Sequence, residues 1–471
     1  MVEQNSTPDS LEKINKVPIM IVLISGAFVA ILNQTLLGTA LPHIMKDLHI
    51  DENTVQWLQS AFMLVNGIMI PITAFLIGRF TTRGLFLTAM TLFSVGTLLA
   101  AIAPNFSMLL SGRVFQAAGA GIMMPLMQTI MMLIFPIEKR GTVMGMFGLV
   151  IAFAPAIGPS LSGYIVEHFP WRTLFYMILP IAIIDIIVAY FILKNVTKQT
   201  FPKIDILSII LSTLGFGGLL YGFSAAGSAG WGSAQVIISF IVGAITLTWF
   251  ILRQLNLKEP ILEMRVFKYK MFTLTTALGM VTFIAMIGAA VVLPLYMQNM
   301  LGFSPLVSGL ALLPGAILQG IMNPVTGRLF DKYGARWLTI IGLSLIVITT
   351  FMLSFLTSET SFTYIATAHA FRMLGVAMAM MPATTAGLNE LPRDLISHGT
   401  AVNNTFRQVS GAIGTALPIT IMTTAAIPEE GVDGMIHGVN VSFVVAAFTA
   451  VIGLIITFFI KDRQRRKIKV G

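Results

Sequence analysis

Fourteen apolar runs, separated by short polar joints, constrain this chain more than any other feature. A helix of about 20 apolar residues is long enough to cross a lipid bilayer. Only 10% of the residues are charged, whereas soluble proteins have about a quarter. The chain is therefore predicted to be an all-α polytopic membrane protein. Its transmembrane helices are expected near residues 17–40, 57–78, 85–103, 108–134, 142–165, 173–193, 206–226, 234–252, 271–297, 306–327, 337–356, 361–388, 400–426 and 441–460.

The basic residues are distributed unevenly between the two sides of this predicted bundle. Of the 29 lysines and arginines, only Lys46 and Arg172 fall in the joints opposite the termini. An even number of spans places both termini on one side, and cytoplasmic loops carry the excess of Lys and Arg. Both termini are therefore predicted to be cytoplasmic. The net charge of +9 reflects this topology, and we expect no binding to nucleic acid.

Several classes of chemistry have no signature in the chain. It has no cysteine, which excludes disulfides and thiolate metal sites. A G-x-x-x-x-G-K-[ST] nucleotide loop, an H-E-x-x-H metal motif and a G-x-S-x-G serine motif are also missing. We therefore expect no enzyme activity, no cofactor and no metal. ATP is therefore not expected to be an energy source for this chain, which leaves an ion gradient.

Two stretches repeat along the chain and indicate two related halves. AFLIGRFTTRG, at 74–84, and GRLFDKYGARW, at 327–337, each follow a predicted span with a turn rich in glycine and arginine. Such repeats are typical of secondary transporters, whose substrate site lies between the halves. The predicted divisions are a cytoplasmic segment at 1–16, a six-helix bundle at 17–193, an inserted helix pair at 206–252, a second six-helix bundle at 271–460 and a basic tail at 461–471.

Few ionisable residues fall inside the predicted spans. Such residues are costly in a membrane and commonly functional. Asp185 is the one acidic residue near the middle of a span, and Arg113 and Arg372 lie deep in glycine-containing spans of the two halves. Asp185 could load and release a proton if a nearby arginine and burial balance its pKa. The alternative for Asp185 is a hydrogen bond or ion pair that serves assembly only.

Polar uncharged residues inside spans form a second candidate set. Each alone is more often a contact between helices than a ligand contact, but the pairs Asn33 with Gln34 and Asn403 with Asn404 are harder to explain in this way. The candidate substrate cavity comprises Asn33, Gln34, Gln319, Asn323, Arg372, Asn403, Asn404 and Arg407.

The stretch GMFGLVIAFAPAIGPSLSGY, at 145–164, combines two prolines with a stripe of small residues. Proline removes backbone donors, and small side chains allow another helix to approach closely. One interpretation is a kinked packing helix. The other is a hinge between two moving bundles, at Pro155, Gly158, Pro159 and Gly163.

These motifs resemble a known family over essentially the whole chain. GRLFDKYGARW resembles the cytoplasmic signature of the major facilitator superfamily, and RVFQAAGAG, at 113–121, is similar to its fourth-helix signature. The proline-containing stretch resembles the fifth-helix signature of antiporters. The fourteen spans, with WRTLFYMILP and LPLYMQNMLGFSPLVSGLALLPG, resemble the QacA/EmrB-type drug:proton antiporters, and ILNQTLLGTALPHIM is similar to their lincomycin-resistance group.

The resemblance implies a fold and roles for particular residues. The fold is two six-helix bundles plus two inserted helices. Arg113 is expected to take part in proton movement. Asp331 and Arg336 are expected to hold a cytoplasmic gate, together with Arg79, Arg83 and Lys332 in the two signature loops.

Three of the chain's departures from the family lie in the first span and the first cytoplasmic loop. Asn33 stands where relatives usually carry an aspartate, and Gly78 and Thr81 replace the aspartate and glycine of the first cytoplasmic loop. One expected proton-binding carboxylate is therefore missing. Asp185 is then the most plausible titrating group.

Together these features predict a proton-coupled multidrug efflux antiporter in a bacterial plasma membrane. It is expected to act as a monomer on drug-like amphipathic molecules, exchanging them for protons by alternating access. One alternative is an exporter or flippase of an endogenous lipid-like or anionic metabolite. A second alternative is a membrane sensor that transports nothing.

Overall fold

The computed structural model describes residues 15–197 and 199–461, and within these residues each predicted span is a helix. The predicted all-α architecture is therefore confirmed; nearly all of the predicted segments 1–16 and 461–471 lies outside the described residues. The helices are α2 (Lys16–Leu48), α3 (Glu52–Arg79), α4 (Thr82–Ala101), α5 (Phe106–Ile134), α6 (Arg140–His168), α7 (Thr173–Ile192), α8 (Ile206–Ala229), α9 (Ala234–Asn256), α10 (Lys270–Asn299), α11 (Pro305–Tyr333), α12 (Arg336–Met352), α13 (Phe362–Asn389), α14 (Ile396–Ala425) and α15 (Gly431–Thr457).

Most of these helices have the length and composition of membrane spans. Within the described part of the chain, 12 are long and apolar enough to cross a bilayer. The two others are α12, which has 17 residues, and α14. α14 carries Asn403, Asn404 and Arg407 in the half nearer its N-terminus. Polar side chains at this depth are tolerated where they face the interior of a bundle.

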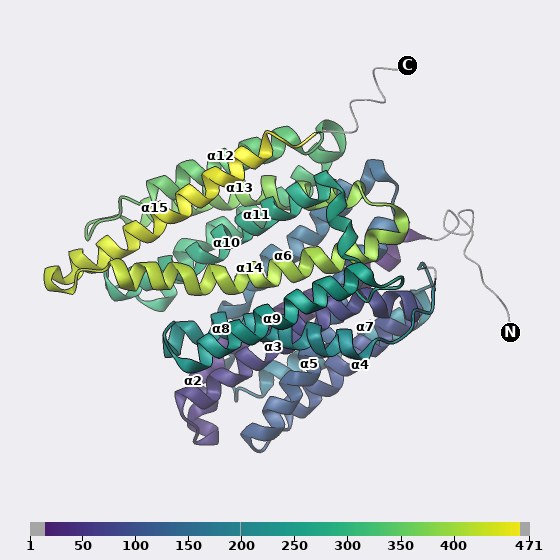
Figure 1. The fold of residues 1–471 in the computed structure, drawn as a ribbon. Coiled ribbons are helices and arrows are strands. Elements are labelled where there is room, and N and C mark those ends of the chain that lie inside the picture. Colours follow the sequence, from purple (N-terminus) through teal and green to yellow (C-terminus); the bar gives the residue numbers. More distant parts are fainter. Residues whose placement is uncertain (1–14, 198, 462–471) are drawn as a thin grey trace.

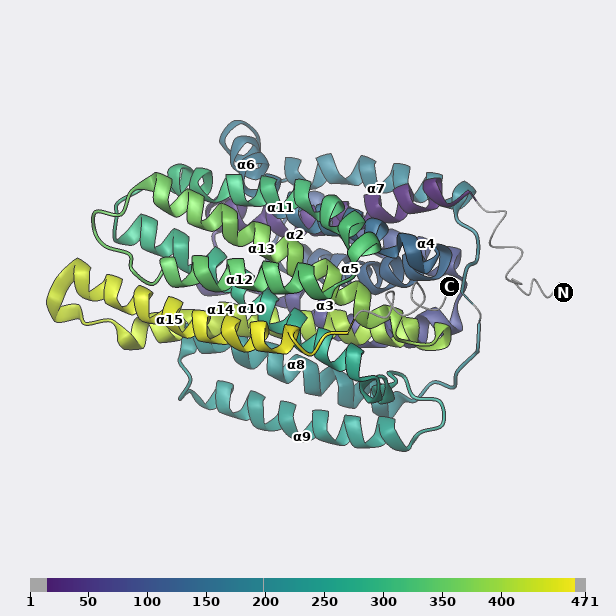
Figure 2. The same cartoon turned by 90° about the horizontal axis from the view of Figure 1, so that it is seen from above.

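The helices form two bundles with an inserted pair beside them (Figure 1). Helices α2 to α7 make the N-terminal bundle, and α10 to α15 make the C-terminal bundle. The inserted helices α8 and α9 pack on each other, and α8 also contacts α3 and α14, one helix from each bundle. Seen from above, this pair lies along one edge of the molecule (Figure 2).

The connections between helices alternate between two ends of the molecule. We call one the basic end, where the turns near 79–82, 134–140, 333–336 and 389–396 lie. The other is the acidic end, whose turns carry Asp51, Glu359 and Glu429. The two bundles meet at the basic end and diverge toward the acidic end (Figure 1).

Glycines allow the close crossing of α6 and α11 that joins the bundles. A Cβ added to Gly141 would lie 2.5 Å from the carbonyl oxygen of Gly327, and one added to Gly145 would overlap the carbonyl oxygen of Asn323. Only glycine leaves room for backbones at this separation. The helices are thereby fixed against each other over the basic half of α6.

The acidic half of α6 packs differently, on α2 of its own bundle. Ala154, Gly158 and Ser162 are buried there. The Thr35 hydroxyl donates a 3.4 Å hydrogen bond to the Ala154 carbonyl oxygen, and a Cβ on Gly158 would overlap that same side chain. Pro155 and Pro159 point away from this contact and are exposed. The stripe of small residues is therefore a packing surface, and α6 contacts a different bundle with each of its halves.

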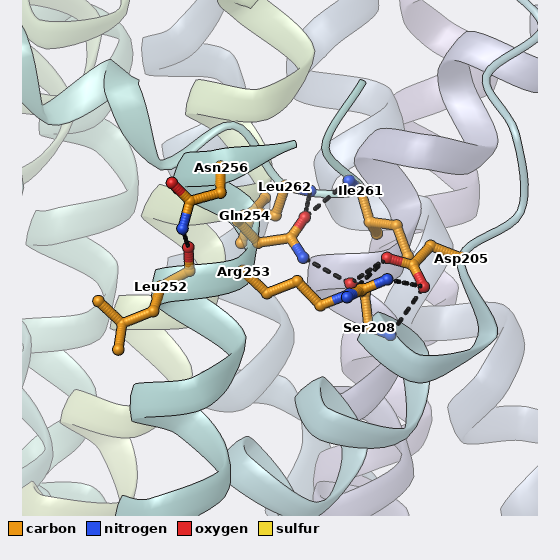
Figure 3. Close-up of polar contacts among 8 residues, drawn as sticks. All are labelled: Asp205, Ser208, Leu252, Arg253, Gln254, Asn256, Ile261 and Leu262. Carbon is orange, nitrogen blue, oxygen red and sulfur yellow. Dashed lines mark hydrogen bonds and ion pairs between the residues drawn. The ribbon is translucent and has the colours of Figure 1, made fainter. Parts of the chain in front are cut away.

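The inserted pair is fastened at the basic end by the contacts shown in Figure 3. Arg253 donates to both carboxylate oxygens of Asp205, at 2.9 and 3.1 Å, and this hydrogen bonding lowers the pKa of Asp205. Next to them, Gln254 accepts hydrogen bonds from the backbone N–H groups of Ile261 and Leu262. The connector between α9 and α10 is thereby folded back onto the pair.

Candidate functional site

A small cavity lies where the two bundles meet. Most of its wall comes from α10, α13 and α14 of the C-terminal bundle, and α5 of the N-terminal bundle completes it. The wall is mixed, with amide, hydroxyl and guanidinium groups next to methionines and a phenylalanine. The lining residues are Gln128, Thr276, Gly279, Met280, Met380, Thr384, Asn403, Asn404, Phe406 and Arg407.

A chain of hydrogen bonds crosses this cavity from one bundle to the other. Arg407 Nη2 donates to Asn404 Oδ1 at 2.8 Å, and Asn404 Nδ2 donates to Gln128 Oε1 at 2.6 Å. Arg407 follows Asn404 at i+3 spacing, so both lie on one face of α14. The rings of Phe147 and Phe283 lie 6.0 and 5.8 Å from the Arg407 guanidinium carbon. Polar and aromatic groups of both bundles therefore converge here.

Hydrogen bonds between the bundles close the cavity toward the basic end. The hydroxyls of Thr129 and Thr400 are 2.6 Å apart, across the contact between α5 and α14. Nearer the basic end, Arg140 Nη1 donates to Asn389 Oδ1 at 2.9 Å. The bundles are thus joined between the cavity and the basic end.

Among the predicted gate residues, Asp331 makes the clearest contact between the two bundles. Its carboxylate accepts from the backbone N–H of Gly141 at 2.7 Å, and from the N–H and hydroxyl of Thr142 at 2.8 and 2.6 Å. These donors belong to the first turn of α6, where the helix dipole favours a negative charge. A side chain of α11 therefore caps a helix of the other bundle.

The basic residues of the predicted gate have other contacts. Arg79 donates to the carbonyl oxygen of Pro202, in the linker before α8, and the Arg83 guanidinium lies 4.1 Å from the centre of the Tyr190 ring. Lys332 and Arg336 are exposed. The linker also covers Gly78, whose carbonyl oxygen accepts from Thr200 N at 2.9 Å. Thr200 and Pro202 of the linker also lie next to the place that a side chain at position 78 would take.

Arg113 belongs to a buried polar cluster of the N-terminal bundle. Its Nε donates to the Leu58 carbonyl oxygen, its Nη1 donates to Gln116 Oε1 at 2.9 Å, and the guanidinium lies over the Phe62 ring. Gln116 Nε2 in turn donates to Thr97 Oγ1 at 2.8 Å and to Asn33 Oδ1 at 3.4 Å. Asn33, at the position of the missing aspartate, is therefore linked to Arg113 through one glutamine.

Asp185 lies apart from both the cavity and Arg113. It is 4% exposed, and within the described residues its Oδ2 has no hydrogen-bond partner. The carboxyl group faces α2: Ser25 is its polar neighbour, and a Cβ added to Gly26 would lie 2.9 Å from Oδ2 and against Met123. Met123 follows Arg113 by ten residues, or about 15 Å along α5. The structure does not bring the two predicted coupling residues together.

The remaining predicted cavity residues are spread along the interface and the C-terminal bundle. Arg372 is fully buried and donates to Thr350 Oγ1 and to the Ala285 carbonyl oxygen. Asn323 lies in the α6–α11 crossing against Gly148, Gln319 contacts Met286, and Gln34 is exposed. Of that predicted set, Asn403, Asn404 and Arg407 line the cavity.

Sequence reasoning missed several residues that shape this region. Gln116 lies inside the quoted motif RVFQAAGAG, so its position beside Arg113 on a helix was a usable signal. Thr142 and Phe147 could not be recognised from the sequence, because their importance depends on which residues of other helices they contact.

Comparisons with known proteins agree with this architecture. A family model described as Major Facilitator Superfamily matches residues 23–415. The chain is 56% identical to the uncharacterized MFS-type transporter YcnB of Bacillus subtilis over 96% of each chain. It is 45% identical to the lincomycin resistance protein LmrB of Listeria monocytogenes, over 96% of this chain and 98% of that one.

Among solved structures, the human organic anion transporter MFSD10 has a similar fold. It aligns with a TM-score of 0.70 at 13% identity, covering 94% of this chain and 99% of that one. The expectation that the chain is not an enzyme is confirmed by this family, whose members are transporters. The chain is therefore a multi-pass membrane protein that belongs to the major facilitator superfamily.

Proposed function

We propose that this protein exports amphipathic small molecules from the bacterial cytoplasm in exchange for protons. The distribution of Lys and Arg supports a cytoplasmic location for the basic end and both termini. Each chain carries a complete pair of bundles with the cavity between them, which supports action as a monomer. The resistance function in the name of the relative LmrB supports drug-like substrates.

The observation that carries the proposal is the cavity between the bundles, closed at one end. Gln128 comes from one bundle and Arg407 from the other, and the Thr129–Thr400 contact closes the cavity toward the basic end. The bundles diverge toward the acidic end (Figure 1). With the basic end in the cytoplasm, this is an outward-facing arrangement. Opening the basic end and closing the acidic end would give cytoplasmic access to the same residues.

Asp185 is the proposed proton carrier. Within the described residues it is the one buried acidic side chain in a spanning helix. It packs against α2, and α2 also holds Asn33 of the Arg113 cluster and Thr35, which contacts α6. A change in the packing of α2 between the two conformations would therefore change the surroundings of Asp185. This supports indirect coupling, in which protonation favours one packing of α2.

Transport in proteoliposomes tests the proposal. Tritiated lincomycin and the neutral fluorescent amphiphile pyrenebutanol serve as substrates, and a pH gradient is imposed with or without the exchanger nigericin. Export coupled to protons predicts accumulation that follows the gradient and collapses with nigericin, and that Asp185→Asn abolishes. A transport rate that ignores the gradient in the wild-type protein would contradict proton coupling.

A further inference from the structure

Among the described residues, the interior of the bundles carries Arg113, Arg372 and Arg407 but one buried acidic side chain, Asp185. Ion pairs among the described residues include Arg172–Asp47, Arg253–Asp205 and Arg265–Glu263. All three lie near helix ends or in connectors. They leave Arg113, Arg372 and Arg407 inside the bundles with neutral hydrogen-bond acceptors only. A buried charge is unfavourable unless it is paired, so the interior as a whole attracts anions.

Arg407 is the arginine of the three that a ligand can reach. Arg113 and Arg372 are 0% exposed, whereas Arg407 is only partly buried and lines the cavity. A guanidinium group has five N–H donors. In the described part of the chain Arg407 uses one of its nitrogens, Nη2, for a hydrogen bond to Asn404. Donors of a permanent cation therefore remain available in the cavity.

Two further polar groups in the lining lack partners. Asn403 lies one helical turn before Arg407, on the same face of α14. Its Nδ2 is buried without a hydrogen-bond partner among the described residues, and so is Thr276 Oγ1 on α10. A buried amide nitrogen can be satisfied only by an acceptor, and a hydroxyl can donate as well. A single ligand group with several hydrogen-bond acceptors could therefore bind Arg407 and both unsatisfied groups.

We propose that this cavity selects amphiphiles with an anionic head group and that Arg407 is the residue that selects them. The head group is held by Arg407 and Asn403, and the apolar body lies against Phe406, Met280 and Met380 of the lining. None of the described lining residues is acidic, so a cationic head group finds no ion-pair partner there and is repelled by Arg407. This inference rests on the proposed export function and narrows its substrate class.

Three fluorescent probes that share one ring system test the selection: pyrenebutyrate, pyrenebutanol and pyrenebutyltrimethylammonium. Binding is read as the half-saturation concentration for thermal stabilisation of the purified full-length protein in one detergent. Micelle partition of a given probe is the same for every variant, so the ratio between variants reports the site. Charge-assisted hydrogen bonds predict that Arg407→Gln raises the half-saturation concentration of pyrenebutyrate by about tenfold or more. The value for pyrenebutanol should change by less than about twofold.

Two further variants make the test specific. Asn403→Asp places a carboxylate one turn from Arg407, so it should weaken pyrenebutyrate binding and strengthen binding of the cationic probe. Lys258→Gln also removes one positive charge, but at an exposed position in the connector after α9. It should leave all three values unchanged.

The outcomes separate this inference from the export function itself. Tighter binding of pyrenebutyrate that depends on Arg407 supports the inference, even if proteoliposomes show no proton-coupled export. Equal binding of the three probes, or loss of pyrenebutyrate binding in Lys258→Gln as well, overturns it. Proton-driven export of the cationic probe at the highest rate would also overturn it, while leaving the export function intact.

Discussion

Asp331 in α11 caps the first turn of α6 through Thr142, which donates both its backbone N–H and its hydroxyl to one carboxylate oxygen, at 2.8 and 2.6 Å. The two residues belong to different bundles. The contact therefore exists only while the basic end is closed. It also places a negative charge at the positive end of a helix dipole. Asp331 is thus positioned to stabilise one conformation of the protein over the other.

Replacing Asp331 with alanine should favour opening of the basic end. The loss of charge-assisted hydrogen bonds and of the dipole interaction is worth about 1–3 kcal/mol, and each 1.4 kcal/mol changes the ratio of conformations about tenfold. Spin labels on cysteines at Ile137 and Trp337, both exposed at the basic end, report the distance between the bundles. The chain has no native cysteine to interfere. Thr142→Val, which removes one donor of three, should give a smaller shift; an unchanged distance distribution in Asp331→Ala would contradict this role.

Replacing Gly145 with alanine should disrupt the crossing of α6 and α11. The added methyl group would overlap the Asn323 carbonyl oxygen, a backbone atom that cannot rotate away. Overpacking of this kind costs about 1–3 kcal/mol. Thermal unfolding of the purified protein measures the loss. Gly309→Ala is the matched control, because Gly309 lies in α11 with no atom within 4 Å of an added Cβ. Equal stability of the two variants would contradict the close crossing.

Asn33→Asp should be tolerated although it buries a carboxylate. Asn33 is linked through Gln116 to Arg113, and its Nδ2 has no partner among the described residues. The new carboxylate replaces an unsatisfied donor and lies close to a buried cation. We expect the unfolding temperature to stay within a few degrees of wild type.

The control for this variant is Asn323→Asp. Asn323 is equally buried, at 2% exposed, but it faces Gly148 in the α6–α11 crossing. An unpaired buried carboxylate there should destabilise the protein by about 2 kcal/mol or more. If both variants lose the same stability, Arg113 does not stabilise a carboxylate at position 33, and the prediction is wrong.

The Asp205–Arg253 pair should make stability depend on pH in the acid range. The hydrogen bond from Arg253 lowers the pKa of Asp205 in the folded protein below its ordinary value of about 4. The contribution of the pair is therefore complete above about pH 4 and is lost as the pH falls through the lower, folded pKa. Asp205→Asn lacks this contribution at every pH. Its deficit in unfolding temperature relative to wild type should be present at pH 7 and shrink at pH 3; a constant deficit would contradict the assignment.

The number and order of the helices could be predicted, because each apolar run is long enough to form one spanning helix. The relation between the two signature loops was also visible, since both combine glycine with arginine in a turn. The direction in which each side chain points could not be predicted. Helix α7 is apolar all round, so its sequence does not show that Asp185 faces Ser25 and Gly26 of α2 instead of the cavity.

Contacts between distant helices were likewise hidden. The role of Thr142 as a partner of Asp331, and the fit of Gly141 to Gly327, depend on how α6 crosses α11. The polar pair Asn403 and Asn404 was found because two adjacent amides are unusual inside a span. The rest of the wall around them could not be predicted, because it comes from other helices, with Gln128 in the opposite bundle.

Proton release on substrate binding tests the proposed antiport most directly. Pyrenebutyrate or lincomycin is added to the purified protein in weakly buffered detergent at neutral pH, and the pH change is recorded for wild type and Asp185→Asn. The account predicts that wild type releases protons with each substrate it binds and that Asp185→Asn binds without release. Binding without proton release in the wild-type protein, or equal release in both, would contradict coupling through Asp185.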